Sequence, residues 1–343
     1  LFGADKLRIF GPTKSAARLE SSKIFAKELM RAQKIPTAEA RTFSDSDEAL
    51  SYCEEVKFPV VIKADGLALG KGVIIASDKV EATATIKAMM TEARFGDAGK
   101  RIVIEELLHG TECSLHALVD GKNYRLFESA RDHKRAFDGD NGPNTGGMGA
   151  FSPANNWTAE MQAGFEAKIM QPLLDGLEKE NVIYRGLLYP GLMMTACGPR
   201  VLEFNCRFGD PETQALLPRM KSDLVTLLEA TIDGKIGAHA IEWDQCASVT
   251  VVLASGGYPG KYETGKKISG LAEAGKLDGV QVFHAGTKTV DGEVLTAGGR
   301  VLAVTALGQT IKMARERAYQ AVSRVHFEGC HYRRDIALSA ANG

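Results

Sequence analysis

Long hydrophobic runs are missing from this sequence: none approaches the roughly 20 apolar residues that a helix needs to cross a bilayer. A charged segment followed by an apolar one, the pattern of a secretory leader, is also absent from its start. Neither sign of charge is in excess, and the net charge of -1 gives no reason to expect nucleic acid or an anionic membrane as a partner. We therefore expect a cytoplasmic protein.

Paired cysteines are missing as well. The six cysteines are scattered without a C-x-x-C pair, which argues against a zinc site or a disulfide framework. We expect reduced and mostly buried thiols. The H-R-D-x-x-x-x-N loop of protein kinases is also absent, so the sequence argues against a protein kinase.

What is present is the composition of a globular protein with several packed units. Hydrophobic residues make up 44% and charged residues 25% of 343 positions, enough for about two or three cores. Helical and strand patterns alternate, which predicts a mixed α+β architecture. Helices are expected at 14–34, 45–56, 79–94, 158–180, 223–233 and 309–325, strands at 59–64, 73–77, 101–108, 187–196, 201–205 and 247–255, and a hairpin within 112–129 that turns at 120–121.

Two lysines surround a glycine-rich turn in "KADGLALGKG". Lys63 and Lys71 lie at a hairpin tip where glycine lets backbone N–H groups approach a phosphate. The stretch is not a P-loop, because its spacing is one residue short, a glycine replaces the hydroxyl residue and a strand follows. An ordinary glycine hairpin remains the alternative. The later "GGRVLAV" is interpreted as a β-turn, since its glycines precede the strand instead of following it.

Glu203 and Asn205 in "VLEFN" are the strongest metal-site candidates. Strand residues two apart point to the same face, so this carboxylate and amide oxygen share one space, as suits magnesium. A solvated strand end is the alternative. Two charges 4 Å apart interact by only about 4 kcal/mol at an effective dielectric near 20, so lysines alone cannot neutralise a triphosphate. A divalent ion is therefore expected beside them.

A base pocket and an unusual loop complete the candidates. In "IVIEELLHGTE", Ile104 and Leu107 could bracket a purine, the backbone of 106–108 could bind its edge, and Glu112 could bind ribose; a plain strand and turn is the alternative. Residues 132–153 show neither a helical nor a strand period, and irregular stretches longer than about 15 residues are uncommon in compact domains. We expect a ligand to shape this segment, with a solvated surface loop as the alternative.

Together, Lys23, "VVIKADGLALGKGV", "IEELLHGTE", "DHKRAFDGDNGPNTGGMGAFSP" and "VLEFNCRFGDPETQ" resemble the ATP-grasp enzymes, and within them the glycinamide ribonucleotide synthetase (phosphoribosylamine-glycine ligase) family. The resemblance implies an α+β ATP-grasp fold, with two lobes that sandwich ATP and a C-terminal, mostly β domain. The opening "LFGADKLRIFGPT" matches only the end of the family's N-terminal α/β domain, of which we expect a remnant. The implied domains are 1–38 for this remnant and linking helix, 39–106 for the small ATP-grasp subdomain, 107–240 for the main one and 241–343 for the C-terminal domain.

The resemblance also implies an activity. ATP and Mg²⁺ (or Mn²⁺) would serve to join glycine to 5-phosphoribosylamine through glycyl phosphate, in a monomer of the purine pathway. Another ATP-grasp ligase and a non-catalytic nucleotide-binding remnant stay open as alternatives. The implied residues are Lys23, Lys63, Gly70, Lys71, Gly72, Glu105, Glu106, Leu107, Leu108 and Glu112 for ATP; Asp132, His133, Lys134, Arg135, Pro143, Asn144, Thr145, Gly147 and Met148 for the substrates; Glu203 and Asn205 for the metal; and Arg207 and Asp210 for catalysis. We expect Arg207 to stabilise the transferring phosphoryl group or the tetrahedral oxyanion, and Asp210 to hold an amine.

Overall fold

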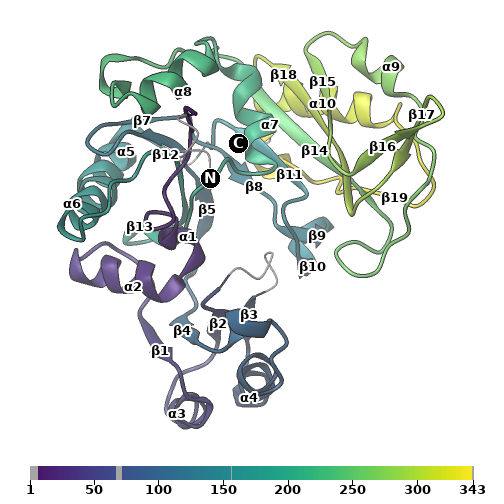
Figure 1. Ribbon diagram of the computed structural model, residues 1–343. Helices are drawn as coiled ribbons and strands as arrows, with labels where there is room; N and C mark the ends of the chain where they lie inside the picture. Colours follow the sequence, from purple (N-terminus) through teal and green to yellow (C-terminus); the bar gives the residue numbers. More distant parts are fainter. Residues whose placement is uncertain (1–6, 67–71, 156, 342–343) are drawn as a thin grey trace.

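A computed structural model describes residues 7–66, 72–155 and 157–341. A small lobe built on β1 to β4 projects from the rest of the molecule, at the bottom of Figure 1. The yellow-green strands of the C-terminal part lie to the right of the main body in this view. The mixed content of helices and antiparallel sheets confirms the α+β prediction.

The small lobe is an antiparallel sheet in the order β1-β4-β2-β3. Alternate residues of a strand face opposite sides, so Ile62 and Ile104 pack into a core with Ile86, while Lys63 and Glu105 face the main body. The predicted hairpin of β2 and β3 is confirmed. The elements of this lobe are β1 (Ala40–Phe43), α3 (Ser46–Tyr52), β2 (Val60–Ala64), β3 (Val73–Ala76), α4 (Lys79–Ile86), which continues as a π-helix (Lys87–Thr91), a 3-10 turn (Gly96–Gly99) and β4 (Ile102–Glu106).

The main body contains a sheet in the order β13-β12-β6-β7, with β5 also paired to β12. The predicted hairpin at 120–121 is confirmed for β6 and β7, but residues 112–114 pair with β12 instead. One face of this sheet packs against helices in a core that includes Leu29, Leu173 and Phe204. The elements are β5 (Thr111–Ser114), β6 (Ala117–Val119), β7 (Tyr124–Leu126), α5 (Ala159–Phe165), a π-helix (Glu166–Met170), α6 (Gln171–Lys179), β12 (Gly186–Thr195), β13 (Gly198–Asn205), α7 (Glu212–Leu216) and α8 (Leu224–Ile232).

The single helix expected over 14–34 is wrong. The chain forms α1 (Arg18–Ser21) and α2 (Lys23–Ala32), separated by Ser22 in an extended conformation. The Ser22 hydroxyl accepts from the Phe25 N–H at 3.2 Å and donates to Asp65 at 3.0 Å. This serine therefore caps a new helix and ties its start to the small lobe.

The C-terminal unit, residues 247–341, builds most of a sheet in the order β15-β18-β14-β11-β8, with β19 paired to β14. Helix α10 packs against β18 and β14 through small residues such as Ala314 and Ala318. The strand expected at 247–255 and the helix expected at 309–325 are both found. The elements are β14 (Ala247–Ser255), α9 (Leu271–Gly275), β15 (Val280–His284), β16 (Thr287–Val290), β17 (Glu293–Thr296), β18 (Arg300–Gly308), α10 (Ile311–Val322), β19 (Cys330–His331) and α11 (Leu338–Ala341).

The 132–153 segment is more regular than expected. It contributes to β8 (Arg131–Asp132) and forms β9 (Arg135–Phe137), β10 (Asn141–Asn144) and β11 (Gly149–Ser152). Strand β11 is buried and lies between β14 and β8. A Cβ at Gly149 would lie 2.6 Å from the Thr250 carbonyl oxygen, so the small residues that hide the strand pattern are what allow this close pairing.

Two further expectations concern thiols and membranes. All six cysteines are free, as predicted, although only Cys53 and Cys113 are buried and Cys197 is exposed. Among the described residues, no helix has the length and apolar character required to cross a bilayer. The domain boundaries stay a prediction. Strands β8 and β11 share a sheet with the C-terminal unit, on the other side of the boundary predicted at 241.

Candidate functional site

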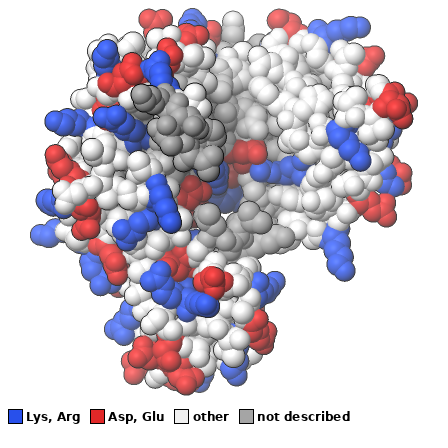
Figure 2. Space-filling model, viewed as in Figure 1, with Lys and Arg blue, Asp and Glu red and all other residues white. Residues whose placement is uncertain are grey.

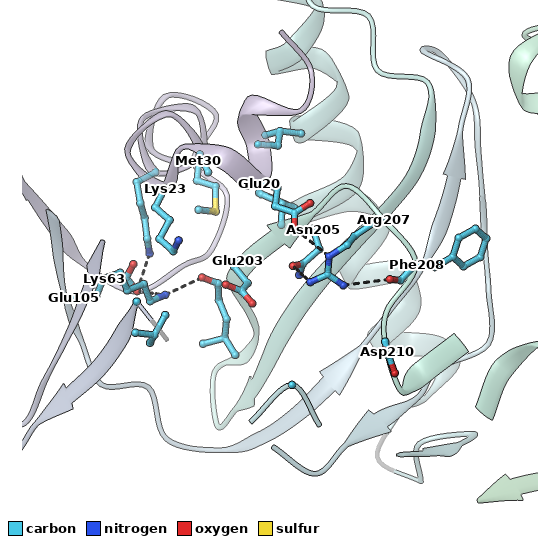
Figure 3. Close-up of a pocket in the computed structure, with 18 of the residues that line it drawn as sticks. Glu20, Lys23, Met30, Lys63, Glu105, Glu203, Asn205, Arg207, Phe208 and Asp210 are labelled. Atoms are coloured by element: carbon cyan, nitrogen blue, oxygen red, sulfur yellow. Dashed lines mark hydrogen bonds and ion pairs between the residues drawn. The ribbon is translucent and has the colours of Figure 1, made fainter. Parts of the chain in front are cut away.

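Two adjoining cavities, of about 710 and 290 Å³, lie between the small lobe and strand β13, and we call them together the cleft. Charged side chains of both signs gather in this hollow between the lobes (Figure 2). Figure 3 shows the larger cavity, in which Glu203 lies between Lys63 and Arg207. The walls common to both cavities include Lys63, Glu105, Gly146, Glu203, Asn205, Arg207 and Asp210.

A buried network joins Lys63 and Glu105 of the small lobe to Lys27 of α2 along one wall of the cleft. Lys63 and Lys27 lie 2.9 and 3.3 Å from the same Glu105 oxygen, and all three side chains are at most 7% exposed. Lys63 also donates to the Leu202 carbonyl oxygen of β13 at 3.1 Å. Burial lowers the pKa of Lys27 to about 8. The other Glu105 oxygen is buried without a partner in the described part of the chain, which leaves one acceptor for a ligand.

Lys23, at the start of α2, adds a further cation to the larger cavity. Its ammonium donates to the Gly66 carbonyl oxygen at 3.3 Å, and burial lowers its pKa, although nearby Glu203 opposes that shift. Gly72 also lines this cavity. The remaining members of the predicted phosphate hairpin, Gly70 and Lys71, lie outside the described residues. The arrangement concentrates positive charge where a polyphosphate would need it.

Glu203 and Asn205 share one face near the end of β13, as their spacing predicts. A β-bulge opposite Gly191 and Leu192 inserts Leu202 as an extra residue just before Glu203. Neither an ion pair nor a hydrogen bond occupies the Glu203 carboxylate among the described residues. Asn205 donates to the Tyr189 carbonyl oxygen at 3.4 Å.

These two oxygen donors suit a hard cation such as Mg²⁺, which keeps several waters and shares phosphate oxygens with its substrate. No group of three His, Cys, Asp or Glu side chains able to hold a metal occurs among the described residues. The donor set therefore fits an ion that is completed by nucleotide and not one that is caged by protein alone.

Arg207 and Asp210 both line the cleft, each with a neighbour that the sequence did not indicate. Arg207 donates to Glu20 at 3.2 Å, and Glu20 also accepts from the Cys206 N–H at 2.7 Å. The Asp210 carboxylate is 3.0 Å from the Arg300 guanidinium. Asp210 is thus already engaged by a cation, which bears on its proposed role of holding an amine.

The apolar end of the smaller cavity differs in part from the expected base pocket. Leu107 and Leu108 line it, and so do Glu106 and Glu112, but Ile104 does not. Ile104 is 1% exposed and points into the small-lobe core, because it lies on the opposite face of β4 from Glu105. The apolar wall is completed by Val61, Val73, Ile75, Met193 and Leu202.

Strand alternation also decides which residues at the start of the 132–153 segment face the cleft. Asp132 and Lys134 face the cleft, where the Lys134 ammonium lies 3.1 Å from Asp132 and 3.4 Å from Glu112. Burial raises the pKa of Asp132 to about 7, although Lys134 opposes the shift. One Asp132 oxygen is buried with no partner among the described residues, so it can accept from a ligand.

Of the other predicted substrate residues, Asn144 and Thr145 line the smaller cavity. Met148 lies in the core of the C-terminal unit, and the His133 ring accepts from the Ala337 N–H at 3.4 Å. Neither cavity is lined by these two residues or by Arg135, Pro143 and Gly147. Their assignments remain predictions.

A polar cluster beneath the cleft was not predicted. Glu212, which is 2% exposed, accepts from Tyr189 at 2.5 Å and from Ser114 at 3.1 Å. Tyr189 stacks on His116, whose Nε2 accepts from the Gly209 N–H at 3.1 Å. These contacts fix the corner that follows β13 and carries Asp210.

The burial of His116 in this cluster should make the protein less stable in acid. Burial lowers the pKa of His116 from 6.5 to about 4, so the unfolded chain takes up a proton first as pH falls. The stability contributed by neutral His116 should fall by about 2 kcal/mol between pH 7 and pH 5. In urea unfolding, the free energy of unfolding of His116→Gln should therefore rise by about 2 kcal/mol relative to that of wild type as the pH falls from 7 to 5. Asp132, whose pKa is raised, changes the stability in the opposite direction, but it does so in both proteins and its effect cancels in the comparison. Parallel pH profiles of the two proteins would contradict the prediction.

Comparison with known proteins places these residues in a family. Residues 21–213 match the model described as phosphoribosylglycinamide synthetase, ATP-grasp (A) domain, and residues 248–339 match the corresponding C domain. The chain belongs to the phosphoribosylglycinamide synthetase family. The A-domain match of this family member spans Lys23 to Glu212, and its C-domain match includes Arg300.

Individual relatives agree with this assignment. The phosphoribosylamine–glycine ligases of Pseudomonas aeruginosa and Escherichia coli K12 are 49% and 50% identical to this synthetase-family chain over 99% of its length and 79% of theirs. The crystal structure of phosphoribosylamine–glycine ligase from Thermotoga maritima superposes with a TM-score of 0.84 at 39% identity, covering 96% of this chain and 81% of that one.

A more distant structure supports the fold alone. Biotin carboxylase from Campylobacter jejuni superposes with a TM-score of 0.73 at 12% identity, covering 99% of this chain and 74% of that one. The predicted ATP-grasp fold of this phosphoribosylglycinamide synthetase family member is confirmed.

Proposed function

We propose that this chain is an ATP-dependent carbon–nitrogen ligase that joins glycine to 5-phosphoribosylamine, giving glycinamide ribonucleotide, ADP and phosphate in purine biosynthesis. The observation that carries the proposal is one cleft in which three lysines of α2 and β2 face the carboxylate and amide of β13, in a member of this family. The finer assignments of substrate, metal and residue roles below are part of the proposal.

The nucleotide would lie across both cavities. Its base fits the apolar wall around Leu107 and Leu108, and its phosphates fit the larger cavity beside Lys23 and Lys63. Glu203 and Asn205 would hold Mg²⁺ or Mn²⁺, which would neutralise charge on the transferring phosphoryl group. The lysines act on the same charge from the opposite wall of the cleft.

The chemistry needs no covalent enzyme intermediate. A glycine carboxylate oxygen attacks the γ-phosphorus of ATP, and ADP leaves; the resulting glycyl phosphate then has a good leaving group. The amine of phosphoribosylamine attacks the carbonyl carbon, phosphate departs, and the nitrogen loses a proton. The protein contributes positioning and charge stabilisation, with Arg207 at the transferring phosphoryl group or the tetrahedral oxyanion.

Substrate amines would bind at the acidic end of the cleft. Among the described residues, one buried oxygen of Asp132 has no hydrogen-bond partner, and Glu112 and Glu212 line the same cavity. This end of the cleft carries three acidic side chains and one basic side chain, Lys134. An excess of negative charge favours a protonated or hydrogen-bond-donating nitrogen over a second anion. Asp210, predicted to hold an amine, would do so only in company with Arg300.

A single assay tests the function. Incubation with ATP, Mg²⁺, glycine and freshly made phosphoribosylamine should give phosphate release that depends on both glycine and the amine, together with glycinamide ribonucleotide by mass spectrometry. Release with another acid in place of glycine would support a different ATP-grasp ligase. Nucleotide binding without turnover would support a non-catalytic role and contradict the proposal. The expected monomeric state and cytoplasmic location stay predictions.

A further inference from the structure

Side chains of the C-terminal unit hold both ends of one glycine in the 132–153 segment. The Gly146 N–H donates to the Tyr258 hydroxyl at 3.1 Å, and the Gly146 carbonyl oxygen accepts from Arg300 at 2.8 Å. Arg300 also approaches the Gly147 carbonyl oxygen at 3.4 Å. Gly146 lines both cavities, so these hydrogen bonds fix the position of one residue of the cleft wall.

The same guanidinium holds the corner that carries Asp210. Arg300 Nη1 donates to the Asp210 carbonyl oxygen at 2.8 Å, and Nη2 lies 3.0 Å from Asp210 Oδ2. Gln214 donates to the other carboxylate oxygen at 2.9 Å. One arginine therefore joins the main chain and the side chain of Asp210 to Gly146, through paired contacts that a lysine ammonium cannot reproduce.

The local chain is shaped to bring Arg300 to this point. Arg300 begins β18 at a bulge, where Ala254 pairs with Arg300 but Leu253 pairs with Leu302. Bulges re-aim side chains and are frequent beside active sites. A Cβ at Gly146 would lie 2.9 Å from the guanidinium carbon, so a larger residue there would displace the Arg300 side chain.

Arg300 lines the larger cavity but not the smaller one with the apolar wall. Its hydrogen bonds lie on Gly146, Gly147 and Asp210, and among the described residues none reaches the small lobe. Gly146 and Asp210 line the smaller cavity together with its acidic residues, whereas its apolar wall comes from other segments. An error in the placement of Arg300 should therefore move the acceptor end of the cleft and leave the apolar wall unchanged.

We propose that Arg300, assisted by Tyr258, is a positioning residue supplied by the C-terminal unit, which holds Gly146 and Asp210 in place for the two substrates other than ATP. This inference rests on the proposed ligase function. It gives the C-terminal unit a part in shaping the substrate end of the cleft, through Gly146 and Asp210.

Steady-state kinetics of Arg300→Lys test this inference. We expect kcat/KM for glycine and for phosphoribosylamine to fall about tenfold or more, since misplacement by about 1 Å can cost up to about 100-fold. The KM for ATP should stay within about twofold of the wild-type value. Tyr258→Phe should cause a smaller loss in the same two parameters. Hydrogen exchange of a peptide covering 141–149 should be faster in Arg300→Lys than in wild type.

A double-mutant comparison separates positioning from general damage. If Arg300 acts through Asp210, Arg300→Lys combined with Asp210→Asn should lose little more than Asp210→Asn alone. Arg315→Lys is the matched control, because Arg315 binds the Ile336 carbonyl oxygen within the same unit at 2.9 Å and lines neither cavity. It should keep wild-type kinetics.

Three results would overturn the inference: unchanged kinetics of Arg300→Lys, an equal rise in the KM for ATP, or fully multiplicative losses in the double variant. Wild-type protein that fails to consume glycine would instead contradict the proposed function. The two failures are therefore distinguishable.

Discussion

Glu203→Gln should lower kcat for glycine-dependent phosphate release by about 100-fold or more. The substitution keeps the side-chain volume but removes the charge that faces Lys23 and Lys63 across the larger cavity. A bound divalent ion stabilises a transferring phosphoryl group by several kcal/mol, and each 1.4 kcal/mol is a factor of about ten in rate. Phosphate release measured over a Mg²⁺ titration should also show half-saturation at a higher concentration than in wild type.

The matched control is Glu178→Gln on the exposed surface of α6, which removes the same charge far from the cleft. It should leave the rate and the Mg²⁺ dependence unchanged. A Glu203→Gln enzyme with near-normal kcat at limiting Mg²⁺ would show that β13 does not hold the metal.

Lys63→Met is expected to impair both folding and catalysis. It removes the shorter of the two contacts to Glu105 and leaves a carboxylate that is 2% exposed with Lys27 alone. Breaking a buried pair from one side costs about 3–5 kcal/mol, and we expect about 3 because Lys27 remains. Loss of a cation near the phosphates should lower kcat/KM for ATP about 100-fold. Urea unfolding and phosphate-release kinetics measure the two effects.

Two further substitutions separate these effects. Adding both Lys27→Met and Glu105→Gln to Lys63→Met removes every charge of the buried network, so the triple variant should regain most of the lost stability without regaining activity. Lys79→Met provides the surface comparison, since its pair with Glu54 is more than half exposed and should contribute less than about 1 kcal/mol. Equal destabilisation by Lys63→Met and Lys79→Met would contradict the buried-network interpretation.

The parts of the site that rest on local periodicity were predictable from the sequence. The alternation of a strand places Glu203 with Asn205, and the same rule separates Lys63 from its core-facing neighbour Ile62. The expectation that Ile104 could bracket a base fails by the same rule, because Ile104 lies on the core side of β4 and Glu105 on the cleft side. The predicted helices from α3 onward were found near their expected places, and Asp45, Asp78 and Asp223 cap the first turns of three of them.

The remaining features depend on contacts between distant segments. Strand β11 is recognisable only by its partner β14, about 100 residues later, and its glycine lacks any strand propensity of its own. Arg300 and Lys27 look like ordinary surface cations in the sequence, and only the packing of three units shows that they reach the cleft. The break at Ser22 could have been anticipated, because serine is a preferred cap in front of a helix.

The position of β11 between β14 and β8 has a consequence for the evolution of this architecture. Asp132 of β8, which lines the cleft, belongs to the same sheet as β14, β15 and β18 of the C-terminal unit. A recombination event that exchanged the last hundred or so residues would have to supply a compatible partner for Gly149–Ser152 as well. Acceptor preference and the C-terminal sequence should therefore have changed together during divergence, and not as interchangeable modules.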